Sequence, residues 1–456
     1  MRTTNFCLKN LGFILILVFP FCYTVFAQSY IGHAFDNYAG VHGIIYNPAN
    51  VVGSPLRSDI NLISVSAFAG SDYFGINLKD IISSDFDFDF DEDALRFPTN
   101  NNHFFAIADV LGPSFMFNMG NKHSIAITTR ARGFLNLDHI SGNLYESISD
   151  GFNLNNDFDF DMEDLNGTIH VFGEIGLSYG RVLMEENTNF IKAGISAKYL
   201  FGAGGLFANS PRLSGSYTAF TNSLNTSGNL DYGFSQDFDS DDISFDNVEN
   251  GLGFDLGLVY EFRPRMLSGE VLGRRHQQYK LKVGVALTDI GSIKYTQAEN
   301  TAYNLNGTVA ASEFDSKDLE QVLEDNYTGQ TTIGSHKISL PTTLHLSADY
   351  HLRSIFYVGI HGALSAVKSN KPSTNHTLNT FTLAPRIETK LFSLYTPLSL
   401  RQYGDVAWGF GLRLGPLTIG SGSILTNILS DNSKTSDVYF GLKIPLYKKV
   451  DYENRF

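Results

Sequence analysis

The chain has 456 residues, a net charge of −14 at neutral pH and 43% hydrophobic residues. Its negative charge repels phosphate, so nucleic acid is excluded as an expected partner. Both cysteines, Cys7 and Cys22, precede residue 28, so the chain beyond them can form no disulfide, thiolate metal site or cysteine nucleophile.

Residues 1–27 have the pattern of a secretory signal peptide. Arg2 and Lys9 precede an apolar run that ends at Phe26, and Ala27 supplies a small residue at the cleavage position. A retained membrane anchor is the alternative, but a spanning helix needs about 20 apolar residues and this run is shorter. We therefore predict that residues 28–456 leave the cytoplasm.

Residues 59–447 are predicted to form a transmembrane β-barrel. No segment after the signal is apolar enough for a spanning helix, whereas many segments alternate apolar with polar residues. Near residue 385, for example, Phe381 and Leu383 alternate with Thr382 and Arg386. Lipid outside and a polar lumen inside explain both faces of such a strand.

The same alternation predicts fourteen antiparallel strands, an even number that brings both ends of the barrel to one side of the membrane. They are 60–81, 103–119, 123–137, 167–183, 189–205, 251–263, 278–297, 336–350, 354–368, 376–391, 392–401, 404–414, 417–427 and 436–446. Short and long connections alternate, as periplasmic turns and extracellular loops do in outer-membrane barrels. The connection 263–277 is longer and more basic than the other predicted turns, and 448–456 is predicted as a periplasmic tail.

The long loops hold the acidic residues. Segments 82–102, 138–166, 206–250 and 298–335 carry −5, −8, −6 and −6, or −25 together, whereas residues 28–456 carry only −16. The rest of the mature chain is therefore positive by nine charges, and the acidity belongs to one side of the barrel.

Three of these loops repeat an alternation of aspartate with an apolar residue, as in SSDFDFDFDEDAL from Ser83. We expect their phenylalanines to pack inward and the three repeats to lie close together as an acidic cap. Its aspartates are candidate contacts for divalent cations or for a partner protein: Asp85, Asp87, Asp89, Asp91, Asp157, Asp159, Asp161, Asp237 and Asp239. An EF-hand is excluded, because Phe90 and Arg96 occupy the positions of its glycine and glutamate. In the fourth loop, 312–325 is predicted as a short helix capped by Ser312.

Six charged residues fall on predicted lumen faces: Arg130, Arg132, Arg386, Glu388, Lys390 and Arg413. They can stiffen the wall by pairing with one another and with a plug, or set the selectivity of a pore. His336, His345, His351 and His361 are expected at different heights or faces of the strands, so no metal site or cofactor is predicted. No catalytic motif occurs, and no enzymatic activity is expected.

Residues 28–58 contain an Asn-Pro-Ala triplet, Asn47, Pro48 and Ala49, just before the first strand. This triplet, followed in order by AGISAKYLFGAGGL, VGVALTDIGSIKY and ISLPTTLHLSADYHL, resembles the long-chain fatty-acid transporter superfamily of outer-membrane β-barrels. The likeness is greatest to a Bacteroidetes branch that includes accessory barrels of secretion and outer-membrane assembly machines. It implies that residues 28–58 form a hatch inside the lumen; a plain turn into strand one is the alternative.

These features predict an all-β protein, a 14-stranded antiparallel transmembrane β-barrel with an N-terminal luminal hatch and long extracellular loops. The expected location is the outer membrane of a Gram-negative bacterium, in contact with outer-membrane lipid. The favoured function is a non-enzymatic accessory subunit of an envelope complex, bound to other envelope proteins. The alternative is a gated transporter or channel for hydrophobic or small molecules.

Overall fold

The computed structural model describes residues 30–77, 94–235, 248–264, 279–404 and 406–448. The predicted signal peptide, most of the first acidic repeat, all of the third and nearly all of the predicted tail lie outside these residues.

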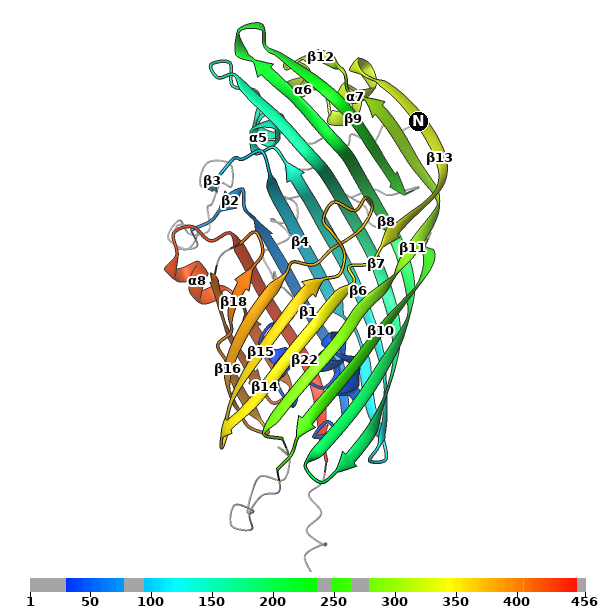
Figure 1. The fold of residues 1–456 in the computed structure, drawn as a ribbon, viewed down its shortest axis with the longest axis vertical. Helices are drawn as coiled ribbons and strands as arrows, with labels where there is room; N and C mark the ends of the chain where they lie inside the picture. The colour runs from blue at the N-terminus through cyan, green and yellow to red at the C-terminus, as the bar shows by residue number, and fades with distance from the viewer. Residues whose placement is uncertain (1–29, 78–93, 236–247, 265–278, 405, 449–456) are drawn as a thin grey trace, which may run out of the picture.

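One antiparallel sheet closes on itself to form a barrel (Figure 1), because β1 pairs with β4 on one side and with β22 on the other. The fourteen predicted strands are confirmed. Four of them are each divided into two shorter strands by a local break in the ladder. In order around the wall they are β1 (Leu56–Ser71), β4 and β5 (Asn102–Leu111, Ser114–Met119), β6 (His123–Ile140), β7 (Phe158–Glu186), β8 (Asn189–Thr218), β10 (Glu249–Phe262), β11 (Leu281–Asn304), β13 and β14 (Thr328–Ser339, Thr343–Arg353), β15 (Phe356–Ser365), β16 (Thr380–Glu388), β17 and β18 (Phe392–Tyr395, Leu398–Arg401), β19 and β20 (Val406–Trp408, Phe410–Leu414), β21 (Leu417–Ser421) and β22 (Thr435–Tyr447).

The two faces of the wall differ as the alternation predicts. Large apolar side chains such as Leu256, Ile360 and Phe410 are exposed on the outside, whereas the neighbouring Asp255 and Arg413 are buried. Among the helices of the described residues, none has the length and apolarity that crossing a membrane requires.

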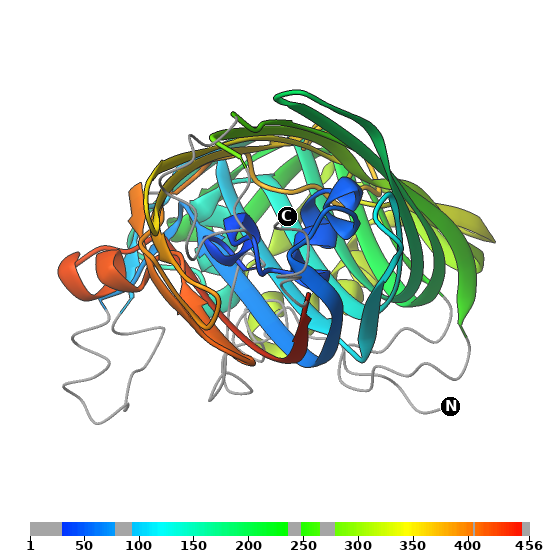
Figure 2. The same ribbon diagram turned by 90° about the horizontal axis from the view of Figure 1, so that it is seen from below.

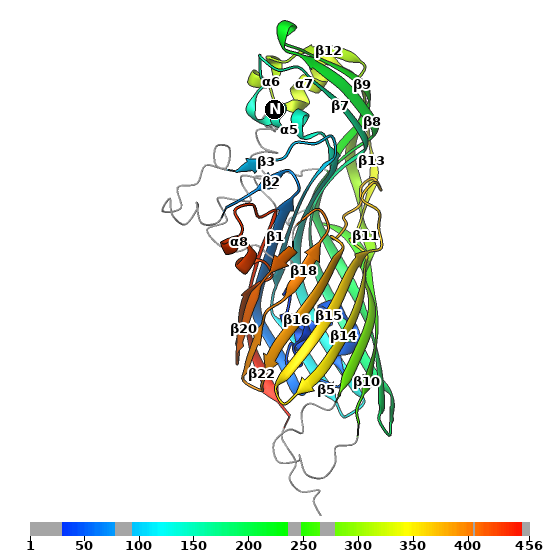
Figure 3. The same ribbon diagram turned by 60° about the vertical axis from the view of Figure 1, so that its left-hand side comes forward.

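The two ends of the barrel are unequal. Turns of two or three residues join strand pairs at what we call the short-turn end; they lie at 120–122, 187–188, 354–355, 389–391 and 415–416. At the opposite, long-loop end, several strands continue far beyond the wall (Figure 3). Strands β7 and β8 are 29 and 30 residues long, whereas β21 has five.

The segments predicted as loops 138–166, 206–250 and 298–335 are therefore largely strand and helix. β9 (Ser223–Ser235) pairs with the extensions of β8 and β11. β12 (Gly307–Ala310) pairs with β9, and together these strands make one tall sheet above one side of the wall. Three helices lie beside it: α5 (Gly142–Asp150), α6 (Glu313–Ser316) and α7 (Leu319–Asn326). A hydrophobic core that includes Tyr145, Phe160 and Leu323 fills the space between them. These segments fold because each strand finds a hydrogen-bonding neighbour, which the sequence of one segment alone does not reveal.

Smaller elements complete the long-loop end. β2 (Phe74–Gly75) pairs with β3 (Leu95–Arg96), and the short helix η4 (Ala219–Thr221) joins β8 to β9. The end of the predicted strand 417–427 is instead a helix, α8 (Ile424–Leu429), because its run of leucine and isoleucine suits either structure. The predicted helix within 312–325 divides into α6 and α7. The Asp318 side chain caps α7, and Ser312 makes no side-chain cap.

The only tryptophan of the chain, Trp408, provides a test of the lipid-facing surface. It lies in β19 with 43% of its surface exposed, and its Nε1 donates to Thr396 Oγ1 at 2.8 Å. We expect lipids brominated on their acyl chains to quench its fluorescence strongly in proteoliposomes, and iodide in the water to quench it weakly. Unbrominated lipid is the control, and the reverse ranking of the two quenchers would contradict this assignment of the outer face.

Candidate functional site

Residues 30–55, which we call the inner segment, lie inside the barrel near its short-turn end (Figure 2). It contains η2 (His33–Phe35), α2 (Val41–Tyr46) and η3 (Pro48–Val51). Val41 and Val51 are fully buried and pack with Met116 and Phe190 of the wall. This is the segment that the sequence predicts as a hatch.

The Asn-Pro-Ala triplet starts η3 and joins it to the wall. Asn47 Oδ1 accepts a hydrogen bond from the Ala49 amide at 2.9 Å, and Pro48 occupies a first-turn position where no N–H is needed. Asn47 Nδ2 donates to the carbonyl oxygens of Leu258 and Val285 at 3.3 and 3.2 Å. One side chain thus both caps η3 and binds it to β10 and β11.

Glycines in the wall let this segment approach closely. A Cβ atom added to Gly194 of β8 would lie 2.3 Å from the carbonyl carbon of Pro48, and one added to Gly257 of β10 would lie 2.1 Å from Asn47 Oδ1. Real side chains do not pack at such distances, so any larger residue at these positions would displace η3.

Ion pairs hold the first half of the inner segment. Arg413 Nε donates to Asp36 Oδ2 at 2.7 Å, and its other nitrogens donate to Ser393 and to the carbonyl oxygens of residues 389 and 390. Lys443 Nζ donates to the carbonyl oxygens of Tyr38 and Ala39 at 2.6 and 2.8 Å. The wall therefore supplies cations to a carboxylate and to open backbone acceptors of the inner segment.

A second group of charges links the wall to Asn37. Arg386 donates two hydrogen bonds of 2.7 Å to Asp349 and one of 2.8 Å to Glu388. Glu388 in turn accepts from the Asn37 amide and side chain at 3.2 and 2.8 Å. Lys390, the sixth residue predicted to face the lumen, is exposed in the turn 389–391 and lies over the ring of Tyr447. The turn begins before residue 390, so the alternation of β16 no longer applies there.

A third network spans six neighbouring wall strands. Arg130 pairs with Asp109, while Arg132 lies 2.9 Å from Asp289. Lys198 Nζ also reaches Asp289, at 2.7 Å. Asp255 and Glu174 complete the group. The sequence analysis did not single out these partners, although most of them lie in predicted strands, and alternation alone would have placed several on the polar face.

A loop between β15 and β16, residues 366–379, crosses the lumen near the long-loop end; we call it the mouth loop. His376 Nε2 lies 2.8 Å from Asp138 Oδ2 of β6, and Asn375 Nδ2 lies 2.7 Å from His170 Nδ1 of β7. Because β6 and β16 are seven places apart among fourteen wall strands, these contacts reach the opposite wall. The mouth loop and the inner segment thus close the lumen from two sides.

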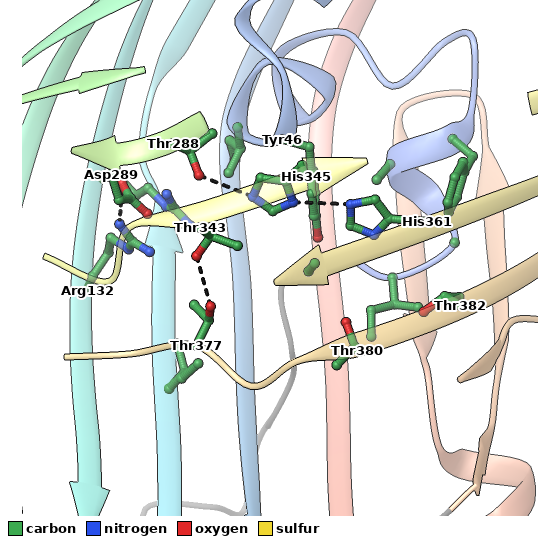
Figure 4. A pocket seen from close by; sticks show the side chains of 18 of the residues that line it. Tyr46, Arg132, Thr288, Asp289, Thr343, His345, His361, Thr377, Thr380 and Thr382 are labelled. Carbon is green, nitrogen blue, oxygen red and sulfur yellow. Dashed lines mark hydrogen bonds and ion pairs between the residues drawn. The ribbon is translucent and has the colours of Figure 1, made fainter. Parts of the chain in front are cut away.

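A small cavity of about 90 Å³ lies in the lumen between these closures (Figure 4). Tyr46 of the inner segment, His345 of β14 and His361 of β15 line it. His345 Nδ1 lies 3.1 Å from His361 Nε2, and the rings stack with 5.3 Å between their centres. The expectation that these histidines lie apart is therefore wrong for this pair, because residues 345 and 363 are paired and residue 361 lies on the same face as 363. Within the described ranges, no three histidine or carboxylate side chains converge as a metal site requires.

The second acidic repeat shows how the aspartates are placed. Phe160 is buried, whereas Asp157, Asp159 and Asp161 are exposed. Asp161 binds Arg212, with nitrogen to oxygen distances of 3.0 and 2.7 Å. The other predicted cap residues lie outside the described part of the chain: Asp85, Asp87, Asp89, Asp91, Asp237 and Asp239.

Comparison with protein families gives one match. The model of the DUF5723 family, described as a family of unknown function, matches residues 48–422. The chain belongs to the DUF5723 family. The match starts at Pro48 and covers almost the whole barrel of this DUF5723 protein. None of the curated proteins matches it.

Solved structures similar to this DUF5723 protein are distant barrels. A Pseudomonas aeruginosa FadL homologue has 10% identity and a TM-score of 0.43, over 92% of this chain and 98% of that one. A deltaS2 mutant of the TodX monoaromatic hydrocarbon channel has 10% identity and a TM-score of 0.43, over 89% and 93%. The CymD monoaromatic hydrocarbon channel has 10% identity and a TM-score of 0.41, over 90% and 94%. The Bacteroidetes branch named above stays a prediction.

The Arg386 ion pairs give a test of how strongly the lumen charges hold the fold. Replacing Arg386 by methionine leaves Asp349 and Glu388 buried without the guanidinium that binds both, which costs about 3–5 kcal/mol of unfolding free energy. Lys390→Met is the matched control on the exposed turn, and we expect it to change stability by less than about 0.5 kcal/mol. Urea unfolding in detergent micelles measures both. Equal losses in the two variants would contradict the pairing.

Proposed function

We propose that this DUF5723 protein is a gated channel of the Gram-negative outer membrane that passes small molecules, with the inner segment and the mouth loop as its two closures. The observation that carries the proposal is the luminal cavity between those closures. A barrel of fourteen strands is wide enough for an aqueous path once its contents move. The proposal assigns the protein no enzymatic activity.

The closures differ in how they are held, and this supports gating. The inner segment packs a large hydrophobic cluster and several buried ion pairs against the wall. The mouth loop packs one leucine, Leu378, against the wall and is otherwise held by hydrogen bonds of Asn136, Asn166, Asn375 and His376. Water can replace such hydrogen bonds at small net cost. We therefore assign the more easily opened closure to the mouth loop.

The orientation follows from the ends of the barrel. In outer-membrane barrels short turns face the periplasm and long loops face the medium. We accordingly place the short-turn end in the periplasm and the tall sheet outside the cell. The accessory role in an envelope complex, the contacts with lipid and envelope proteins and the binding of divalent cations at the acidic cap stay predictions.

Displacing the inner segment tests the channel. Gly194→Val places a side chain where η3 lies, so we expect conductance in planar bilayers to rise at least tenfold, at a potential where the wild type stays closed. Gly362→Val is the matched control, because a Cβ there meets nothing within 4 Å. Limited proteolysis reports whether the inner segment has moved. The mouth loop is opened in the same measurement by Asp138→Asn, which removes its contact with His376. A displaced inner segment without increased conductance in this double variant would rule out a channel along the lumen.

The mouth loop predicts a pH dependence. Burial alone lowers the pKa of His376, but the hydrogen bond to Asp138 and its negative charge raise the pKa above the ordinary 6.5. The contact therefore stabilises the closed loop fully below about pH 6.5 and loses this contribution as pH rises through the raised pKa. We expect the conductance of Gly194→Val, whose inner segment no longer closes the lumen, to increase with pH over this window. Adding Asp138→Asn to this variant should raise conductance at low pH and flatten the profile; an unchanged profile would contradict the assignment.

A further inference from the structure

A second, larger cavity lies at the short-turn end, between the inner segment and the wall strands β8, β10 and β11. Its volume is about 280 Å³. Polar backbone and side chains of the inner segment form one side, among them Asn37, Gly40 and Ser54. Figure 2 views the barrel from this end, with the inner segment inside it. This cavity is separate from the one beside His345.

Four cations line this second cavity: Lys192, Arg263, Lys282 and Lys448. They come from β8, from the residues beside β10 and β22, and from β11. They are far apart in the sequence, so the fold itself gathers them. Three carboxylates share the lining: Asp36, Glu185 and Glu261.

The carboxylates do not neutralise the four cations. Asp36 is bound by Arg413 from the wall, which leaves Glu185 and Glu261 for the four cations. Glu261 accepts from Arg263 at 2.6 Å and lies 3.6 Å from Lys192, so it serves two of them. Counted over the described residues, with Asp349 beside Lys282 included, the lining has an excess of one positive charge.

Lys282 is only weakly paired. Its Nζ donates to Asn37 Oδ1 at 3.2 Å and lies 3.9 Å from Asp349. Asp349 already accepts two hydrogen bonds of 2.7 Å from Arg386. An ammonium group has three donors, so Lys282 keeps donor capacity toward the cavity.

Lys192 and Lys448 are crowded by like charge. Lys192 Nζ donates to the Val52 carbonyl oxygen at 2.8 Å and is 5% exposed. Burial and the charge of Arg263 lower the pKa of Lys448. A low-dielectric cleft lined by one sign of charge attracts the opposite ion, and a bound anion would relieve this crowding.

We infer that the cavity at the short-turn end is a binding site for a small soluble oxyanion, a phosphate or a carboxylate. Lys282 and Lys192 are its principal ligands, and Lys448 adds charge at the rim. Liquid water occupies about 30 Å³ per molecule, so the cavity admits inorganic phosphate or a short dicarboxylate and excludes a lipid. The site lies at the opposite end of the lumen from the mouth loop. Its binding of an anion does not require that the protein be a channel.

Titration calorimetry on the purified full chain in a non-ionic detergent tests this site. The probes are inorganic phosphate and succinate, with choline chloride at matched ionic strength as the blank. We expect saturable binding of at least one oxyanion to the wild type. Lys282→Gln should weaken it about tenfold, the usual value of a hydrogen bond from a charged donor. Lys294→Gln, exposed on the same strand, should leave it unchanged.

Two further variants fix the interpretation. Glu185→Gln removes an exposed negative charge from the rim and should tighten binding about twofold, which loss of structure would not do. Lys282→Arg should restore most of the affinity that Lys282→Gln loses. Absence of saturable binding by the wild type, or equal affinities in Lys282→Gln and Lys294→Gln, would overturn the site.

Discussion

The lumen of this barrel contains many charged groups, and their compensation is the constraint on which the rest of the structure depends. Burying a carboxylate or guanidinium without a partner costs more free energy of desolvation than a folded protein can tolerate. Asp36 therefore lies against Arg413, and the Tyr38 and Ala39 carbonyl groups lie against Lys443. The wall and the inner segment each leave unpaired charge without the other. We infer that they fold as one unit, and that the inner segment cannot leave unless water or another ion takes its place.

Alternation along single strands was enough to predict the barrel. A strand such as β20 carries Phe410, Leu412 and Leu414 on one face and Arg413 on the other, and only lipid outside with a polar lumen accommodates both. Five of the six charges expected in the lumen are buried there, because a period of two fixes the face of each residue within a strand. Lys390 departs from this pattern because the turn begins one residue earlier.

What alternation could not predict depends on partners distant in the sequence. β9 reads as a polar loop, yet it is a strand because β8 and β11 lie beside it with unpaired backbone groups. The mouth loop has no periodic pattern of apolar residues, and its Asn375 finds its hydrogen-bond partner only on the opposite wall of the lumen. His345 and His361 meet through the register of β14 with β15, which no single strand specifies. The gathering of cations at the second cavity could likewise not be predicted, because four separate segments of the chain contribute them.

The unequal height of the wall has a mechanical consequence. At about 3.3 Å per residue the 30 residues of β8 extend roughly 100 Å, whereas a membrane takes only about 9–11 residues of a strand. The same strand ends beside η4 at the tip, and near its other end Gly194 touches Pro48. β7 runs alongside it, joined by backbone pairing along nearly its whole length with two register shifts, and its Gly180 meets Val51. A force applied at the tip would therefore be transmitted along these two strands to the residues that contact η3.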